Sequence, residues 1–215
     1  DGTGMGTDHS IWGAELLHVN GDGFQRLATF EGCPLPGGDA AVQNPARQLL
    51  ARWIKAGITV SDDWLQTLGV GRNELNIWRM QCEKGLNAPI SHAAGRVFDA
   101  FSVMIGAAPP IITYEAQTAI LLEAVARRFV GSMPSLLPFT TQERDALLYI
   151  DWTEMFARFA GCPPAKETTE ELALAFHQTL IEASIEMLKY GHERCGPLPI
   201  VLSSGVMMNQ VFCQG

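Results

Sequence analysis

The sequence predicts an α/β protein in which short strands near both ends of the chain flank a mainly helical middle. Two apolar runs, at 15–19 and 24–30, are joined by Asn-Gly-Asp-Gly at 20–23, which is typical of a β-hairpin because Asn and Gly tolerate positive φ. Apolar residues then recur at helical spacing from 39 to about 194. Near the end, the run at 200–202 predicts a short buried strand that turns into a helix.

We therefore expect three parts: a β-rich part with a glycine loop (1–38), a mainly helical part (39–198) and a truncated strand-turn-helix (199–215). The 215 residues are 47% hydrophobic and 18% charged, which is ordinary for a folded protein. The net charge is −8 without any basic run, so we expect no nucleic-acid partner. Polar residues interrupt every apolar stretch before the roughly 20 residues that cross a bilayer, so we expect no membrane partner.

The five cysteines are scattered and include no C-x-x-C pair, which predicts reduced thiols in a cytoplasmic protein and neither a zinc knuckle nor a disulfide framework. They are Cys33, Cys82, Cys162, Cys195 and Cys213. The chain opens directly on the glycine loop, without an initiator Met or a signal peptide. We therefore expect an excised segment whose ends need not be domain ends.

Capping residues set the expected element boundaries of the middle part. Asp39 caps the first helix, Ser61 or Asp62 caps the second, and Gly85 closes the third. The expected helices span 39–57, 61–68, 73–83, 95–105, 114–130, 152–160 and 168 to about 194, with a loop at 133–138 and a strand at 146–151.

The first stretch of the chain, Asp1-Gly2-Thr3-Gly4-Met5-Gly6, places three glycines behind a carboxylate. Such a stretch brings backbone N–H groups close to a ligand, and phosphate or acyl oxygens are groups that they bind. The alternative is a hairpin loop without a ligand, and these residues alone leave it open.

Two later segments offer similar chemistry. A strand at 200–202, a Ser203-Ser204-Gly205 turn and a helix carrying Asn209 expose N–H groups at a helix start, where phosphates and nucleotides bind. Strand-turn-helix units are also common as purely structural elements.

The helix expected from 95 offers one carboxylate, Asp99, suited to hold a ribose diol. The alternative for Asp99 is an i,i+3 ion pair with Arg96 on a solvated face. Glu115, where the next helix opens, is in the same way either a ligand contact or a favourable acid in a first helical turn.

The five histidines show no H-x-x-x-H or H-E-x-x-H spacing, so a self-contained metal site is not expected. His177 lies among apolar residues of the longest helix and is expected to be a hydrogen-bonded core residue. The sequence contains no G-x-S-x-G, no Walker lysine loop and no Rossmann fingerprint.

Five motifs, taken in order, resemble the C-terminal domain of the HypF-type carbamoyltransferases of NiFe-hydrogenase maturation. Residues 1–15 are similar to D-G-T-G-x-G-x-D-x-x-x-W-G-G-E, 34–41 to P-L-P-G-G-D-x-A, 95–99 to G-R-x-F-D, 114–117 to Y-E-G-Q and 203–209 to S-G-G-V-x-x-N. The family is related to the tRNA threonylcarbamoyladenosine synthases and to antibiotic O-carbamoyltransferases. The resemblance therefore implies a fragment of the actin and sugar-kinase type of ATPase fold with a large helical insert.

The resemblance also implies a function. The domain would take carbamoyl-adenylate, made from carbamoyl phosphate and ATP in the full-length protein, and pass the carbamoyl group to the C-terminal cysteine of a HypE acceptor. Mg²⁺ would accompany ATP, and a divalent metal, Fe²⁺ or Zn²⁺, would polarise the carbamoyl carbonyl. The implied site residues are Asp1 at the metal, Gly2, Thr3 and Gly4 at the carbamoyl or phosphate end, Asp99 at the ribose, Glu115 and Ala116 at the nucleoside, and Gly205 and Asn209 at the adenylate.

Three residues depart from the family motifs. Ala14, Ala116 and Ser204 stand where the motifs have Gly, and each adds a side chain where backbone would approach a ligand. The family's H-H-x-x-H metal ligands and a further Asp ligand are not among these residues, so we expect the chain alone neither to bind metal tightly nor to turn over.

Two other functions stay open at this point: a catalytically decayed nucleotide-binding module, and an O-carbamoyltransferase of the antibiotic-biosynthesis group. A sugar-kinase-like phosphotransferase lacks a candidate Asp base. The preferred reading depends on one geometric prediction, that turns from the two ends of the chain meet across a single cleft with Asp1, Asp99 and Asn209 around it.

Overall fold

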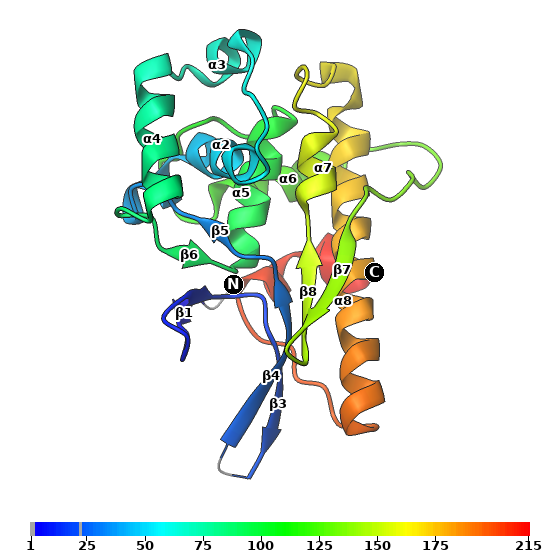
Figure 1. Cartoon of the computed structure of the whole chain (residues 1–215). Helices are drawn as coiled ribbons and strands as arrows, with labels where there is room; N and C mark the ends of the chain where they lie inside the picture. The colour runs from blue at the N-terminus through cyan, green and yellow to red at the C-terminus, as the bar shows by residue number, and fades with distance from the viewer. Residues whose placement is uncertain (1–2, 22) are drawn as a thin grey trace.

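The computed structural model describes residues 3–21 and 23–215 and confirms the α/β class (Figure 1). Asp1, Gly2 and Asp22 lie outside the described residues, so the roles expected of Asp1 and Gly2 remain predictions. The described strands form two four-stranded sheets, ordered β1-β2-β6-β5 and β3-β4-β8-β7. Their bounds are β1 Gly4–Met5, β2 Ile11–Trp12, β3 Leu16–Asn20, β4 Gly23–Phe30, β5 Cys33–Pro34, β6 Ile90–Ser91, β7 Thr140–Arg144 and β8 Leu147–Asp151.

The β3–β4 hairpin forms as predicted, with antiparallel pairing from Leu16 and Ala28 to Asn20 and Gly23. Beyond the hairpin, β4 runs parallel to β8, which is the strand expected at 146–151. Strands of the expected β-rich and helical parts therefore share one sheet. Strand β7 pairs with β8 but was not expected, because all five of its residues are exposed and none is apolar, so it shows no apolar alternation.

Helices make up most of the chain from 39 to 195. Ser61 caps α3 by accepting the Trp64 N–H at 3.3 Å, and Gly85 ends α4 at φ 65°, both as predicted. The helices are α1 Asp39–Gln43, α2 Pro45–Lys55, α3 Asp62–Leu68, α4 Arg72–Lys84, α5 Ala94–Met104, α6 Gln117–Ala126, α7 Thr153–Ala157, α8 Thr169–Cys195 and α9 Gln210–Gln214, with 3-10 turns η1 Lys166–Thr168 and η2 Gly205–Met208.

Three expected helices have other bounds. The first is split into α1 and α2 because Pro45 has no N–H to continue the helical hydrogen bonds, and Gly38, not Asp39, takes the cap position. Helix α6 begins only at Gln117, because Ala116 has left-handed backbone angles that a helix excludes. Helix α7 ends at Ala157, three residues earlier than expected.

The predicted buried strand near the C-terminus is wrong. Residues 197–203 form neither helix nor strand, and the Val201 side chain is 86% exposed. Pro197 and Pro199 lack the N–H groups that a neighbouring strand would accept, and no strand in the described part of the chain pairs with this segment. The segment was predicted to be buried because it is apolar, but no other described residues cover it.

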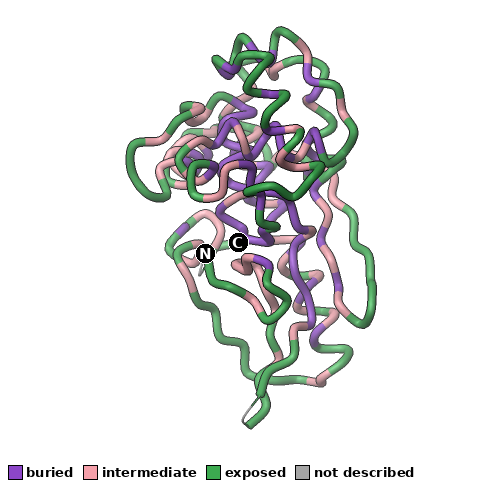
Figure 2. The backbone as a smooth tube through the Cα atoms, turned by 60° about the vertical axis from the view of Figure 1, so that its left-hand side comes forward, coloured by how far each residue is buried: buried purple, intermediate pink, exposed green. Residues whose placement is uncertain are grey.

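The core lies where the helices pack against one another and against β4 and β8, while the end of the β3–β4 hairpin is exposed (Figure 2). Helix α5 is buried on nearly every side, not along a single stripe. The Phe101 ring of α5 stacks on Phe176 of α8 with 4.5 Å between ring centres. Trp53 of α2 and Trp64 of α3 meet edge to face at 4.9 Å. Aromatic contacts thus join both consecutive helices and helices that are far apart in sequence.

Candidate functional site

The glycine-bearing loop at 3–15 is held by hydrogen bonds from its own side chains. Oδ1 of Asp8 accepts from the Ser10 backbone N–H (3.0 Å), the Ser10 hydroxyl (2.6 Å) and the Trp12 indole N–H (2.9 Å). Burial acts to raise the pKa of Asp8, but these hydrogen bonds and the nearby Arg26 outweigh it and hold the pKa below its usual range. Asp8 therefore stays ionised and closes the loop around Trp12.

The guanidinium of Arg26 joins this loop to strand β4. It pairs with Asp8 (Nη1 to Oδ2, 3.0 Å) and with Glu15 (Nη2 to Oε1, 2.9 Å), and it lies 4.2 Å from the centre of the Trp12 ring. The side chains of Arg26 and Glu15 are only 9% and 8% exposed. Breaking a buried pair by removing one partner leaves an uncompensated charge, so this network is a strong constraint on the loop.

Glu15 also fixes the turn that precedes it. Its Oε2 accepts the backbone N–H groups of Gly13 (2.6 Å) and Ala14 (2.8 Å). Ala14, which replaces a motif glycine, is not among the described residues with positive φ. Its methyl group therefore causes no backbone strain, and the turn forms with Ala at this position.

Gly4 and Gly6 differ in their surroundings. A Cβ on Gly6 would lie 2.0 Å from the Trp12 Nε1 atom, so the close approach of the indole requires glycine there. Nothing lies within 4 Å of the Cβ position of Gly4, and Thr3 and Gly4 are both exposed. The open part of the loop is thus where the carbamoyl or phosphate group is expected.

The Asp99 carboxylate is enclosed between α5 and the first turn of α6. Its Oδ1 accepts from the Thr118 hydroxyl at 2.5 Å, and its Oδ2 lies 3.2 Å from Arg96 Nε without the alignment of a hydrogen bond. Burial raises the pKa of Asp99, against the opposite effects of Arg96 and Thr118. The ion pair with Arg96 exists, as one alternative predicted, but it is buried and not solvated.

Glu115 and Ala116 are exposed and directly precede α6. Ala116 has φ 58° and ψ 13°, a left-handed conformation that costs about 1–2 kcal/mol for a residue with a Cβ. This explains why glycine suits the third position of the Y-E-G-Q motif. The Ala in this chain keeps the turn at the expense of strain.

The C-terminal turn presents Gly205 outward and Asn209 inward. Gly205 is exposed, whereas Asn209 is buried. Oδ1 of Asn209 accepts the Phe212 N–H at 3.0 Å, and Nδ2 donates to Nε2 of His177 at 2.9 Å. Ser204 has φ 115°, which favours glycine, as at Ala116.

A groove of roughly 1060 Å³ runs between β3, the C-terminal half of α8 and the segment at 196–204. Its lining includes 13–19 from one end of the chain and 196–204 from the other, so the two ends do meet across one hollow. Asp99 and Asn209 do not line it, because both are buried. Gly4, Gly6 and Gly205 do not line it either, so the structure does not confirm the predicted cleft between the two glycine-bearing turns. The site roles of Asp99 and Asn209 remain predictions.

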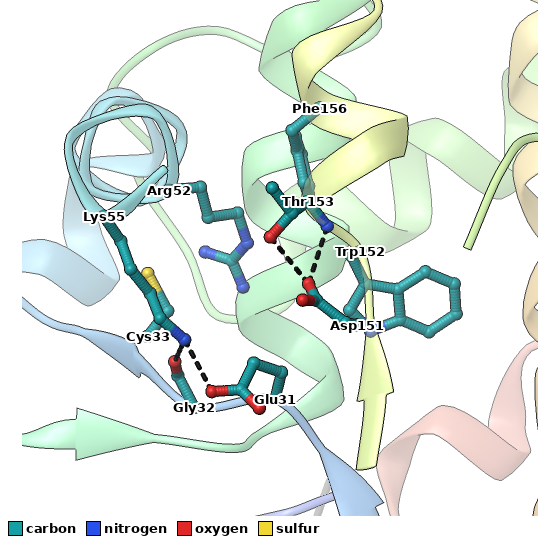
Figure 3. A pocket seen from close by; sticks show the side chains of 9 residues that line it. All are labelled: Glu31, Gly32, Cys33, Arg52, Lys55, Asp151, Trp152, Thr153 and Phe156. Carbon is teal, nitrogen blue, oxygen red and sulfur yellow. Dashed lines mark hydrogen bonds and ion pairs between the residues drawn. The ribbon is translucent and has the colours of Figure 1, made fainter. Parts of the chain in front are cut away.

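A second hollow, of roughly 20 Å³, lies between β5, α2 and the start of α7 (Figure 3). The cations of Arg52 and Lys55 are balanced there by the carboxylates of Glu31 and Asp151, and Lys55 Nζ lies 2.7 Å from Glu31 Oε1. Burial raises the pKa of Cys33, so its thiol stays protonated and a poor nucleophile. The space admits little more than a water molecule and is too small for a nucleotide.

Within 3–21 and 23–215, no three His, Cys, Asp or Glu side chains are grouped to hold a metal ion. The predicted ligand Asp1 lies outside these ranges. The described residues therefore do not supply a complete set of metal ligands. All five cysteines are free thiols, and no helix in the described part of the chain is long and apolar enough to cross a membrane.

Comparison with known proteins shows the family of this chain. The family model described as "Carbamoyltransferase, Kae1-like Domain, second subdomain" matches residues 1–215. The chain belongs to this carbamoyltransferase family. Its predicted fold, of the actin and sugar-kinase type found in Kae1-like domains, is thereby confirmed.

Relatives in three organisms carry the same family name. Carbamoyltransferase HypF of Rhodobacter capsulatus is 38% identical over 136 residues, which are 63% of this chain and 18% of the relative. A HypF homolog of Cupriavidus necator is 31% identical over 215 residues, which cover 99% of this chain and 54% of the relative. A probable carbamoyltransferase HypF of Methanocaldococcus jannaschii is 29% identical over 100% of this chain and 27% of the relative. The chain thus spans between about a fifth and a half of these relatives.

Two solved HypF structures share the fold over the whole chain. Full-length HypF in the phosphate- and nucleotide-bound form is 25% identical with a TM-score of 0.82, and the chain covers 27% of it. HypF of T. kodakarensis is 27% identical with a TM-score of 0.78, and the chain covers 28% of it. The carbamoyltransferase family therefore keeps this arrangement of helices and sheets at low sequence identity.

Sequence reasoning missed Arg26 and the partner of Asn209. Arg26 lies 18 residues after Asp8 and 11 after Glu15, and His177 lies 32 residues before Asn209. No local spacing signals such pairs. The single hint for Arg26 is a lone cation within the apolar strand of the predicted hairpin.

Proposed function

We propose that this chain forms the nucleotide-binding part of a carbamoyltransferase that passes the carbamoyl group of carbamoyl-adenylate to the C-terminal cysteine of a HypE-like acceptor in NiFe-hydrogenase maturation. Membership of the carbamoyltransferase family supports the reaction class. A relative of known structure binds phosphate and nucleotide, which supports ATP and carbamoyl phosphate as substrates of the complete protein. The five free thiols fit a reducing compartment such as the cytoplasm.

The observation that carries this proposal is that three segments predicted to bind the nucleotide are all attached to helix α6. Asp99 is hydrogen-bonded to Thr118 in its first turn, and the exposed segment 115–116 directly precedes it. The Gln210 N–H, just after the C-terminal turn, donates to Glu123 of α6 at 3.0 Å. Segments far apart in sequence are thereby fixed to the same helix, which is how a site for one ligand is built.

Exposure divides the predicted contacts into two groups. Glu115, Ala116 and Gly205 are exposed and can meet a nucleotide directly. Asp99 and Asn209 are buried, and they are hydrogen-bonded to Thr118 at the start of α6 and to His177 of α8. We infer that the exposed residues contact the adenylate and that the two buried side chains fix their positions.

The proposed transfer needs only carbamoyl-adenylate and the acceptor thiol. An acceptor thiolate attacks the carbamoyl carbon, a C–S bond forms, the C–O bond to the adenylate phosphate breaks, and AMP leaves, while the thiol proton passes to solvent. Backbone N–H groups of the loop at 3–4 are suited to stabilise the charge on the carbonyl oxygen.

A second candidate is a nucleotide-binding module that has lost catalysis. It is favoured by Ala116 and Ser204, two non-glycine residues at positive φ where the motifs have glycine. Such a module would bind AMP but would not release it from carbamoyl-adenylate in the presence of an acceptor.

The test is calorimetric titration of AMP into the complete gene product, with Asp99→Ala as the site variant and Asp151→Asn, in the separate small pocket, as the control. We expect Asp99→Ala to weaken AMP binding at least tenfold and Asp151→Asn to leave it unchanged. Equal binding by wild type and Asp99→Ala removes Asp99 from the site, and no binding by the wild type overturns the proposal. AMP release that needs an acceptor peptide ending in Cys, and not in Ser, separates the enzyme from the module.

A further inference from the structure

A buried hydrogen-bond chain links helix α8 to the C-terminal turn. Nδ1 of His177 donates to the Ala173 carbonyl at 2.7 Å, since a carbonyl can only accept. Its Nε2 therefore carries the lone pair and accepts from Asn209 Nδ2 at 2.9 Å. Asn209 Oδ1 in turn accepts the Phe212 N–H at 3.0 Å. Every ring nitrogen and both atoms of the amide are used, so only the neutral ring in this tautomer fits.

The surroundings of the ring favour that neutral form. His177 is fully buried, and the Phe98 and Phe176 rings lie 5.8 Å from it. Burial lowers the pKa of His177, against the opposite effects of its bond to Ala173 and of Glu123. Glu123, the charged group that acts on the ring from α6, is itself paired with Arg127.

The contact with His177 is one of those that hold the turn, beside the packing of Val206 and Phe212 against the core. Residues 197–203, which lead into it, have no sheet partner in the described part of the chain. At the far end of the turn, Asn209 is hydrogen-bonded to His177 of α8 and Gln210 to Glu123 of α6. Ser204, with its positive φ, directly precedes the four-residue turn Gly205–Met208 that these anchors hold.

We propose that His177 is a positioning residue for the nucleotide site: through Asn209 it holds the Gly205 turn in place for the adenylate. This inference rests on the proposed function and deepens it, because it names the group behind a predicted contact. His177 itself, fully buried, touches no ligand.

The test compares two replacements of His177 in the complete gene product. His177→Gln keeps an acceptor for the Asn209 amide, whereas His177→Leu removes it. We expect His177→Leu to weaken AMP binding at least tenfold, and His177→Gln to remain within threefold of the wild type. The matched control is Thr179→Val, which removes a buried hydroxyl of the same helix that accepts the Leu137 N–H and donates to the Ala175 carbonyl, neither of which belongs to the turn. It should leave AMP affinity unchanged even if the melting temperature falls.

A pH profile adds a readout that packing alone does not produce. Because the folded pKa of His177 is lowered, the wild type should keep its AMP affinity above pH 6.5 and lose it as the pH falls toward that pKa, when the ring takes up a proton and the Asn209 bond breaks. His177→Gln should lack this acid loss.

Hydrogen exchange without nucleotide separates the two proposals. His177→Leu should speed exchange at 205–214 and not in α2. Faster exchange there together with no AMP binding by the wild type overturns the proposed function and leaves the anchor intact. Unchanged exchange, or equal AMP affinity in His177→Leu and the wild type, overturns the positioning role.

Discussion

Two regions of the molecule are held together by different physical means. The helical half (α1–α6 and α8) is packed through buried apolar and aromatic side chains such as Leu122 and Phe101. On the groove side (the loop at 3–15, the β3–β4 hairpin and the segment at 196–204), the loop is fixed to β4 by a charge network in which Arg26 and Glu15 are buried and Asp8 is half-exposed. Some of its apolar residues, Val19 and Val201 among them, are exposed, whereas Leu27, Ala28 and Phe30 of β4 are buried.

This difference shows that apolar composition and burial are separate properties. The segment at 198–202 is as hydrophobic as a core strand, yet it lines an open groove. The hydrophobic effect depends on the apolar area that is buried and not on the direction of a contact. Hydrogen bonds and ion pairs depend on direction, so a network of them fixes a loop in one conformation. The loop at 3–15 is thus the part of the groove side that directional contacts fix.

The sharpest test of the comparison contrasts two arginines. Arg26→Met leaves two carboxylates of the groove side without their partner and should cost about 3–5 kcal/mol of unfolding free energy. Arg72→Met, on the helical half, breaks an exposed pair with Asp62 and should cost at most about 1 kcal/mol. Urea denaturation of both variants measures this, and similar losses would show that the loop network is not a constraint.

Two leucines test the apolar side of the comparison. Leu122 is 0% exposed. Leu122→Ala should lower the free energy of unfolding by about 2–5 kcal/mol, because it leaves a cavity in the core. Leu202, which is 62% exposed, should change stability by no more than about 0.5 kcal/mol on the same replacement. Thermal unfolding of the 215-residue chain checks both, and a large loss at Leu202 would contradict the exposed position of its segment.

The smallest expected effect concerns the motif alanines. Ala116→Gly should stabilise the chain by about 1 kcal/mol, because it relieves the left-handed strain before α6. Ala14→Gly should be neutral or slightly destabilising, since Ala14 has no positive φ and Gly adds freedom to the unfolded chain. Melting temperatures compare the two, and stabilisation by both would mean that the strain at Ala116 is not the cause.

Much of the fold followed from local patterns. Ser61 predicted the start of α3 and Gly85 the end of α4, because these signals act within one helical turn. The motifs likewise predicted the family, since their spacing does not depend on the packing. Strand β7 and the segment at 199–203 were mispredicted because exposure in a sheet is decided by neighbours, not by the strand itself.

By itself the sequence determined the class of fold, the hairpin, most helix boundaries and the carbamoyltransferase family. Only the tertiary structure decided what each candidate side chain does. Asp99 faces Thr118, Asn209 faces His177, and Arg26 joins carboxylates from distant parts of the chain. The reason is physical: a cap or a turn is a contact between residues a few positions apart, whereas burial, charge pairing and pKa depend on groups that only folding brings together.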